Sequence, residues 1–233
     1  MLLEHLKKKQ QKLQSKNTDF YTSLGLHVYI KDAIVDDSID IERVIAQVEE
    51  ILPSSFLSEV EMILVGDFDE FRDRQISAAY KDGALYISNV QADENDMVDD
   101  IIHEISHSLE EPYGYDLYYD EKLKNEFLQK RDRLHKILWA NEFKVPKSFF
   151  ADVEYSEELD NYLLNKVDFA KLTQFCVGLF INAYAPTSLR EYFATGFTDF
   201  FMEPSGHEYL KRISPVLYKK INDLYDRERL DNP

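Results

Sequence analysis

The amino-acid sequence predicts an α+β protein, with a mixed sheet in the N-terminal half and helices in the C-terminal half. Short β-prone runs and one helical run alternate between residues 27 and 88. An Asp82-Gly83 pair separates two of the β-prone runs, which is the strongest short-range signal of a hairpin. After Pro112 the apolar residues follow long helical patterns. At 233 residues with 44% apolar content, the chain is long enough for one domain with a sizeable insertion.

The predicted elements follow one another in a simple order. In the first half we expect a strand at 27–30, a helix at about 40–52, strands at 60–65, 75–80 and 84–88, and then a helix that begins after Asp93. In the second half we expect helices at about 118–140, 156–166, 169–183, 188–203 and 206–229, with a long loop at 141–155. Residues 1–233 are predicted to form a single domain, made of an α/β half at 17–111, a helical insertion at 112–183 and a helical part at 184–233. Residues 1–16 are expected to form a short amphipathic helix or arm.

Composition excludes several classes of protein. The net charge of −17 argues against a nucleic-acid surface. No run of 18 apolar residues exists, which predicts no membrane span. The start of the chain lacks the apolar core of a signal peptide, and Cys176 is the only cysteine. These features predict a reducing, cytoplasmic location, with association with a virion as the alternative.

The most informative residues are His103, Glu104 and His107, which form an H-E-x-x-H string inside the helix that follows Asp93. Two histidines four residues apart lie on one face of a helix and can offer two nitrogens to one metal ion. Neutral imidazole suits zinc, and a catalytic zinc site has three protein ligands with a fourth position open. Glu104, next to the first histidine, is then the predicted general base.

The helix itself supports this prediction. Its apolar residues recur with the spacing of a buried face: Val98, Ile101, Ile102, Ile105 and Leu109. Asp93 is the expected N-cap, and acidic residues fill the first turns. The alternative is an amphipathic helix whose two histidines are solvated or hydrogen-bonded without a metal.

A zinc site needs a third ligand, and the sequence offers several carboxylates. Glu110 occupies the place of the glycine in the extended H-E-x-x-H-x-x-G-x-x-H pattern, which excludes that class. Glu126 has a spacing known from aminopeptidases, but its surroundings suggest a solvated, charge-rich helix. Glu191 begins an otherwise apolar helix, where an unpaired carboxylate is costly. Glu191 is therefore the preferred ligand, although Ser188-x-x-Glu191 is also a capping box.

The string at 103–107 and the later Glu191-Tyr-Phe-Ala-x-Gly-Phe helix together resemble the gluzincin metallopeptidases, and most of all the group of the anthrax lethal factor catalytic domain and its phage and bacterial relatives. The similarity covers about 95–111 and 184–201. It implies a zincin-like fold, with the sheet packed on the metal helix, and zinc held by His103, His107 and Glu191. It also implies that Tyr184, seven residues before the ligand glutamate, points its hydroxyl into the site; the alternative is a tyrosine that packs a helix end.

The sequence thus predicts a zinc-dependent metalloendopeptidase that acts on a protein or peptide, with catalytic residues Glu104 and Tyr184 and no nucleic-acid or membrane partner. By the same resemblance, the hairpin at 75–89 would line the substrate cleft, unless it only completes the sheet. Two alternatives remain: a protein that is not an enzyme, and a protease with a different target. One is a structural or virion-associated protein that binds zinc without turnover, and the other is a regulatory protease that cleaves a repressor.

Overall fold

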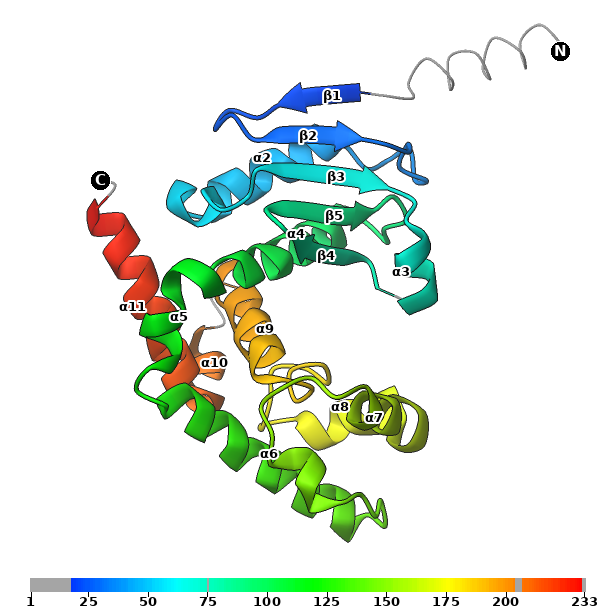
Figure 1. Ribbon diagram of the computed structural model, residues 1–233, viewed down its shortest axis with the longest axis vertical. Coiled ribbons are helices and arrows are strands. Elements are labelled where there is room, and N and C mark those ends of the chain that lie inside the picture. Colours follow the sequence, from blue (N-terminus) through cyan, green and yellow to red (C-terminus); the bar gives the residue numbers. More distant parts are fainter. Residues whose placement is uncertain (1–17, 75, 204–206, 232–233) are drawn as a thin grey trace, which may run out of the picture. The chain divides into compact units, whose positions relative to one another are not determined.

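The computed structural model describes residues 18–74, 76–203 and 207–231, and the chain divides into two compact units, the first ending at Ser108 and the second beginning at Leu109. The architecture is α+β, as predicted: the sheet lies in the first unit, and the described elements of the second unit are helices (Figure 1). The predicted arm at residues 1–16 lies outside the described residues, as do residues 75 and 206 at the ends of two predicted elements. The single-domain organisation stays a prediction.

The first unit is a five-stranded mixed sheet with helices packed on it. Its elements are β1 (Thr18–Tyr21), β2 (His27–Ile30), α2 (Ile41–Ile51), the short 3-10 helix η1 (Ser54–Leu57), β3 (Met62–Gly66), α3 (Asp69–Arg74), β4 (Ala78–Lys81), β5 (Ala84–Ser88) and α4 (Glu94–Ser108). The strand order is β1-β2-β3-β5-β4, in which β2, β3 and β5 are parallel and both edge strands are antiparallel (Figure 1). Helix α4 packs against α2, β4 and β5. The predicted strands and helices of this half are all present; β1 and α3 are additions.

The hairpin β4–β5 forms at the predicted Asp-Gly turn. Asp82 and Gly83 have φ angles of 51° and 80°, so both central residues adopt the positive φ that a two-residue hairpin loop with the favoured twist requires. The register pairs Lys81 with Ala84 across this loop. Because β5 is paired with β3 on its other side, β4 is the edge of the sheet.

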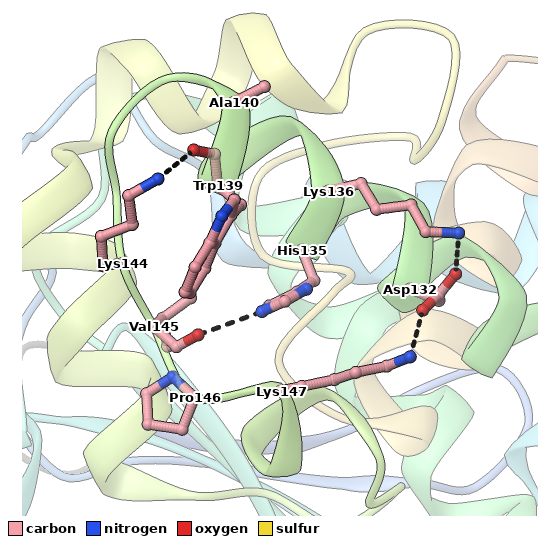
Figure 2. Close-up of a pocket in the computed structure, with 9 residues that line it drawn as sticks. All are labelled: Asp132, His135, Lys136, Trp139, Ala140, Lys144, Val145, Pro146 and Lys147. Carbon is pink, nitrogen blue, oxygen red and sulfur yellow. Dashed lines mark hydrogen bonds and ion pairs between the residues drawn. The ribbon is translucent and has the colours of Figure 1, made fainter.

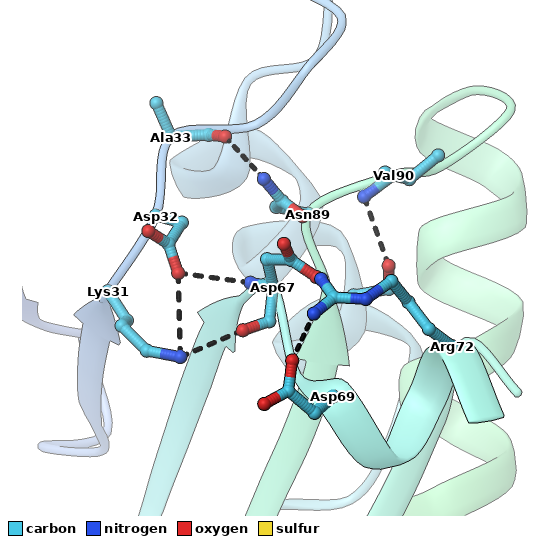
Figure 3. Close-up of polar contacts among 9 residues, drawn as sticks. Lys31, Asp32, Ala33, Asp67, Asp69, Arg72, Asn89 and Val90 are labelled. Atoms are coloured by element: carbon cyan, nitrogen blue, oxygen red, sulfur yellow. Dashed lines mark hydrogen bonds and ion pairs between the residues drawn. The ribbon is translucent and has the colours of Figure 1, made fainter. Parts of the chain in front are cut away.

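Polar contacts tie together the loops that follow the three parallel strands (Figure 3). After β2, Lys31 Nζ donates to the Asp67 carbonyl at 2.8 Å, and an Asp32 carboxylate oxygen accepts from Asp67 N–H at 3.1 Å. After β5, Asn89 Nδ2 donates to the Ala33 carbonyl at 2.9 Å. These bonds satisfy backbone groups that the ends of the strands leave unpaired, and they hold the segment that leads from β5 into α4.

The second unit is helical. Its elements are α5 (Glu110–Tyr118), α6 (Lys122–Ala140), the 3-10 helix η2 (Lys147–Phe150), α7 (Glu157–Tyr162), the π-helical turn η3 (Leu163–Val167), α8 (Phe169–Cys176), α9 (Leu189–Met202), α10 (His207–Ile213) and α11 (Pro215–Asp231). Helix α6 packs against α8, α9 and α11. The predicted insertion at 112–183 and the part at 184–233 therefore lie in one compact unit.

Helix α5 was not predicted, and two of the predicted helices in this unit are interrupted. The helix predicted at 169–183 ends at Cys176, because Val177 turns extended and Gly178 follows with a φ of 72°. The stretch predicted as one helix at 206–229 is two helices, since Pro215 cannot continue a helix interior and instead begins α11. In both cases the apolar period runs on past a break in the backbone.

Helix α6 is not the solvated helix that the sequence suggested. It buries four large apolar side chains completely: Leu123, Phe127, Leu134 and Leu138. It also buries Lys130 and Arg131, whose exposed fractions are 5% and 0%. These apolar residues recur at helical spacing, but the many charged residues between them led to the prediction of a solvated helix. No helix in the described part of the chain is long and apolar enough to cross a bilayer.

Candidate metal centre

Helix α4 is positioned by its apolar face and by its N-terminal cap. The five apolar residues predicted to be buried, Val98 to Leu109, are all 0% exposed. Asp93 Oδ1 accepts from the Asp96 backbone N–H at 2.9 Å, and the Asp96 carboxylate accepts from Ala92 N–H at 3.2 Å. The predicted N-cap is therefore confirmed, and it is reinforced by a reciprocal bond. Burial of one face fixes which residues of α4 lie on the opposite side.

His103 and His107 lie side by side on α4, on a stripe next to the buried face. Their ring centroids are 5.2 Å apart, and the ring planes are nearly perpendicular, at 80°. Both side chains are half-buried. The two imidazoles are thus presented together on one helix face, which is the arrangement the spacing predicts.

Glu104 is held against the edge strand of the sheet. A Glu104 carboxylate oxygen accepts from Tyr80 backbone N–H at 2.8 Å. Ser88 N–H donates to the Ser77 carbonyl, so residues 77, 79 and 81 make the ladder bonds to β5, and the backbone groups of residues 78 and 80 face away from it. The Glu104 carboxylate is therefore anchored by the outward side of β4. Sequence reasoning missed this anchor, because it depends on β4 being the edge strand.

The carboxylate of Asp100, one turn before His103, is hydrogen-bonded to the loop that precedes α4. Its carboxylate accepts from Gln91 Nε2 at 3.2 Å, and burial raises its pKa to about 7. This carboxyl group is engaged by the loop that enters α4. The hydrogen bond to Gln91 and the packing of α4 on the sheet both stabilise the start of the helix.

Glu191 lies in the first turn of α9 and is half-buried. Ser188 Oγ is the N-cap and accepts from the backbone N–H of Glu191 at 3.1 Å. The cap thus uses the backbone of Glu191. Asp160 lies near it, because the negative charge of Glu191 adds to burial in raising the pKa of the Asp160 carboxyl. Sequence reasoning gave no signal for Asp160.

The closeness of α9 to α11 depends on a glycine. A Cβ built on Gly196 would lie 2.3 Å from Leu217 Cδ2 of α11. Leu217 is itself fully buried. The absence of a side chain at 196 therefore allows α9 and α11 to pack closely, and this packing holds the first turn of α9 in place.

Tyr184 lies in the turn that leads to α9. Asn182 Oδ1 accepts from the backbone N–H groups of Tyr184 and Ala185, both at 2.9 Å, and the Tyr184 carbonyl accepts from Thr187 N–H and Oγ1. These bonds fix the backbone of the turn. Tyr184 is 39% exposed, and its role in catalysis stays a prediction.

Glu126, the rival for the third ligand, has a structural role. Glu126 Oε1 accepts from Tyr192 Oη at 2.8 Å and from Leu217 N–H at 3.1 Å, while Oε2 accepts from Val216 N–H at 2.8 Å. Both oxygens thus cap the N-terminus of α11 and join it to α9. Glu110, the other nearby carboxylate considered, pairs with Arg190 Nε at 2.9 Å.

The chain was compared with known proteins in three ways. No family model, no curated protein and no solved structure matches it.

Proposed function

We propose that this protein is a zinc metallopeptidase that hydrolyses peptide bonds, with a zincin-like arrangement of a sheet behind the metal helix. The observation that carries the proposal lies within α4 and β4. Two half-buried imidazoles lie together on one helix face, and Glu104, next to the first of them in the sequence, accepts a hydrogen bond from a backbone N–H of the edge strand. A purely structural zinc site would not need the carboxylate.

The proposed ligands are His103, His107 and Glu191. His103 and His107 come from α4, and Glu191 comes from the first turn of α9. Two nitrogens and one carboxylate oxygen are a donor set that suits catalytic zinc. Both oxygens of Glu126 are already bonded to the cap of α11 and to Tyr192, which favours Glu191 over it.

The residues of the chain divide the reaction between them. Zinc, when bound, supplies Lewis-acid chemistry, which polarises the scissile carbonyl and acidifies a water molecule. Glu104 accepts a proton from the attacking water and returns it to the leaving nitrogen. Tyr184, whose side chain is partly exposed on a rigid turn, would donate a hydrogen bond to the developing oxyanion or to the leaving amine.

The edge strand supplies the proposed binding surface for substrate. The backbone groups of Ala78 face away from β5, so an extended peptide can pair with β4 there by strand addition, next to the Tyr80 N–H that Glu104 occupies. This would lay the peptide alongside Glu104, because Glu104 contacts the same edge.

The test combines metal analysis with hydrolysis of a mixed peptide library, followed by mass spectrometry. We expect about one zinc per chain and cleavage by the purified protein. Glu104→Gln should keep zinc while hydrolysis falls by roughly 10² or more, since it removes a proton acceptor and not a ligand. Glu111→Gln, the same change at an exposed site on α5, is the matched control and should be unaffected. Hydrolysis that survives Glu104→Gln would refute the mechanism. Zinc without any cleavage would favour the structural alternative.

The third ligand is tested by zinc titration of two variants. Glu191→Ala should weaken zinc binding by orders of magnitude and abolish cleavage. Glu126→Ala should retain tight zinc and lose stability instead, because its oxygens cap a helix. The reverse pattern would assign the ligand to Glu126.

A further inference from the structure

A groove of about 720 Å³ lies in the second unit, between the last turns of α6 and the loop that follows it (Figure 2). We call it the α6 groove. Residues 132–140 of the helix form one side, and residues 144–147 of the loop form the other. Its volume falls in the range of ligand-binding sites, and nothing in the proposed zinc chemistry uses it.

The walls of the groove are apolar and are held in place. Trp139 is 50% exposed, and its ring lies between the Lys144 side chain and the His135 ring (Figure 2). Lys144 Nζ is 4.3 Å from the Trp139 ring centroid, and the His135 and Trp139 centroids are 5.8 Å apart. His135 Nε2 bonds to the Val145 carbonyl at 3.0 Å, which fixes the imidazole against the loop. The Trp139 ring is thus held in place by its neighbours, while half of the residue stays exposed.

The rim of the groove is basic, in a chain whose net charge is −17. Lys136 Nζ and Lys147 Nζ both pair with the Asp132 carboxylate, at 2.6 Å and 3.2 Å. Lys144 Nζ donates to the Trp139 carbonyl at 2.8 Å, and the acceptor in this bond is neutral. The lining therefore holds three ammonium groups and one carboxylate, and two of the three pair with it (Figure 2). The dipole at the end of α6 favours a cation there, but it does not require three around one apolar groove.

We propose that the α6 groove binds a short acidic peptide segment, with an apolar side chain on Trp139 and flanking carboxylates on Lys136, Lys144 and Lys147. Charge complementarity carries the choice of partner, and the exposed indole supplies the anchor. A long polyanion such as a nucleic acid is disfavoured, because the chain as a whole carries a net charge of −17.

Trp139 is the only tryptophan in the chain, so its fluorescence reports on the groove directly. The probe is a five-residue peptide with blocked ends, leucine at the centre and two aspartates on each side. We expect a saturable change in Trp139 emission, weakened about tenfold or more when asparagine replaces aspartate or glycine replaces leucine. Raising the salt concentration should weaken binding as well. No saturable change, or equal binding of the asparagine peptide, would overturn the proposal.

Substitutions at the rim test the proposal with opposite signs. Lys144→Gln combined with Lys147→Gln should weaken binding of the aspartate peptide about tenfold. Asp132→Asn should tighten it several-fold, because it removes the carboxylate that competes for Lys136 and Lys147. Lys219→Gln, which removes an equally exposed lysine from an ion pair on α11, is the matched control and should change nothing. Weaker binding by Asp132→Asn would contradict the proposal.

The outcome is independent of the zinc proposal. The same titrations with Glu104→Gln should give the same affinity, since the groove uses residues of α6 and its loop alone. Failure of peptide binding would leave the metal centre standing, and absence of zinc would leave the groove standing.

Discussion

Replacement of Glu126 offers a sharp test of how the second unit is held together. In Glu126→Gln one oxygen can still accept hydrogen bonds, but the amide group must face donors. If the amide oxygen stays near Tyr192 Oη and Leu217 N–H, the NH₂ group faces the Val216 N–H, which donates to Oε2 in the native protein. Two donors then face each other. At least one half-buried donor at the start of α11 is then left without a partner.

The expected loss follows from these contacts. A half-buried donor left unsatisfied costs about 1–3 kcal/mol, and hydrogen bonds to a charged acceptor are at the upper end of that range. The loss of a negative charge at a helix N-terminus costs a further 0.3–1 kcal/mol, roughly. We therefore expect Glu126→Gln to reduce the free energy of unfolding by about 2–4 kcal/mol, with zinc content unchanged.

Urea unfolding followed by Trp139 fluorescence measures this directly, because Trp139 lies on the same helix as Glu126. Glu121→Gln is the control: Glu121 is at the start of α6 and pairs with Lys124 on the surface, so its loss should cost less than about 0.5 kcal/mol. A loss below about 1 kcal/mol for Glu126→Gln would refute the capping role. Loss of zinc would return Glu126 to the list of ligands.

Three further predictions concern other contacts. Gly196→Ala should lower the free energy of unfolding of the second unit by about 1–3 kcal/mol, because the added methyl collides with Leu217. The double variant with Leu217→Ala should lose less stability than the sum of the losses in the two single variants. Strict additivity of the losses would contradict the contact. Burial lowers the pKa of Lys130 from 10.5 to about 8, so between these pH values the unfolded chain binds more protons than the folded chain. The free energy of unfolding should therefore rise with pH in this range, by up to about 3 kcal/mol relative to the Lys130→Met variant. Parallel pH profiles of the two proteins would disprove the shift. Asp93→Ala should cost about 1 kcal/mol of stability in the first unit through loss of the bond from Asp96 N–H, as followed by circular dichroism; an unchanged unfolding midpoint would mean that the cap is dispensable.

The sequence by itself determined those features that depend on near neighbours along the chain. The start and the buried face of α4 follow from Asp93 and from the spacing of its apolar residues, and the hairpin follows from Asp82-Gly83, since caps and tight turns are built from two to four consecutive residues. The placing of His103 and His107 together is likewise a property of helical spacing.

Only the tertiary structure decided the features that depend on distant segments. Strand β1 forms because it pairs with β2. Its four residues show no clear alternation of apolar and polar side chains, so the sequence did not predict the strand. Glu126 caps a helix that begins 89 residues later in the chain, and Tyr80 anchors Glu104 because β4 lies at the sheet edge. The role of a carboxylate is set by the donors that the fold brings to it, and those donors are not its neighbours in sequence.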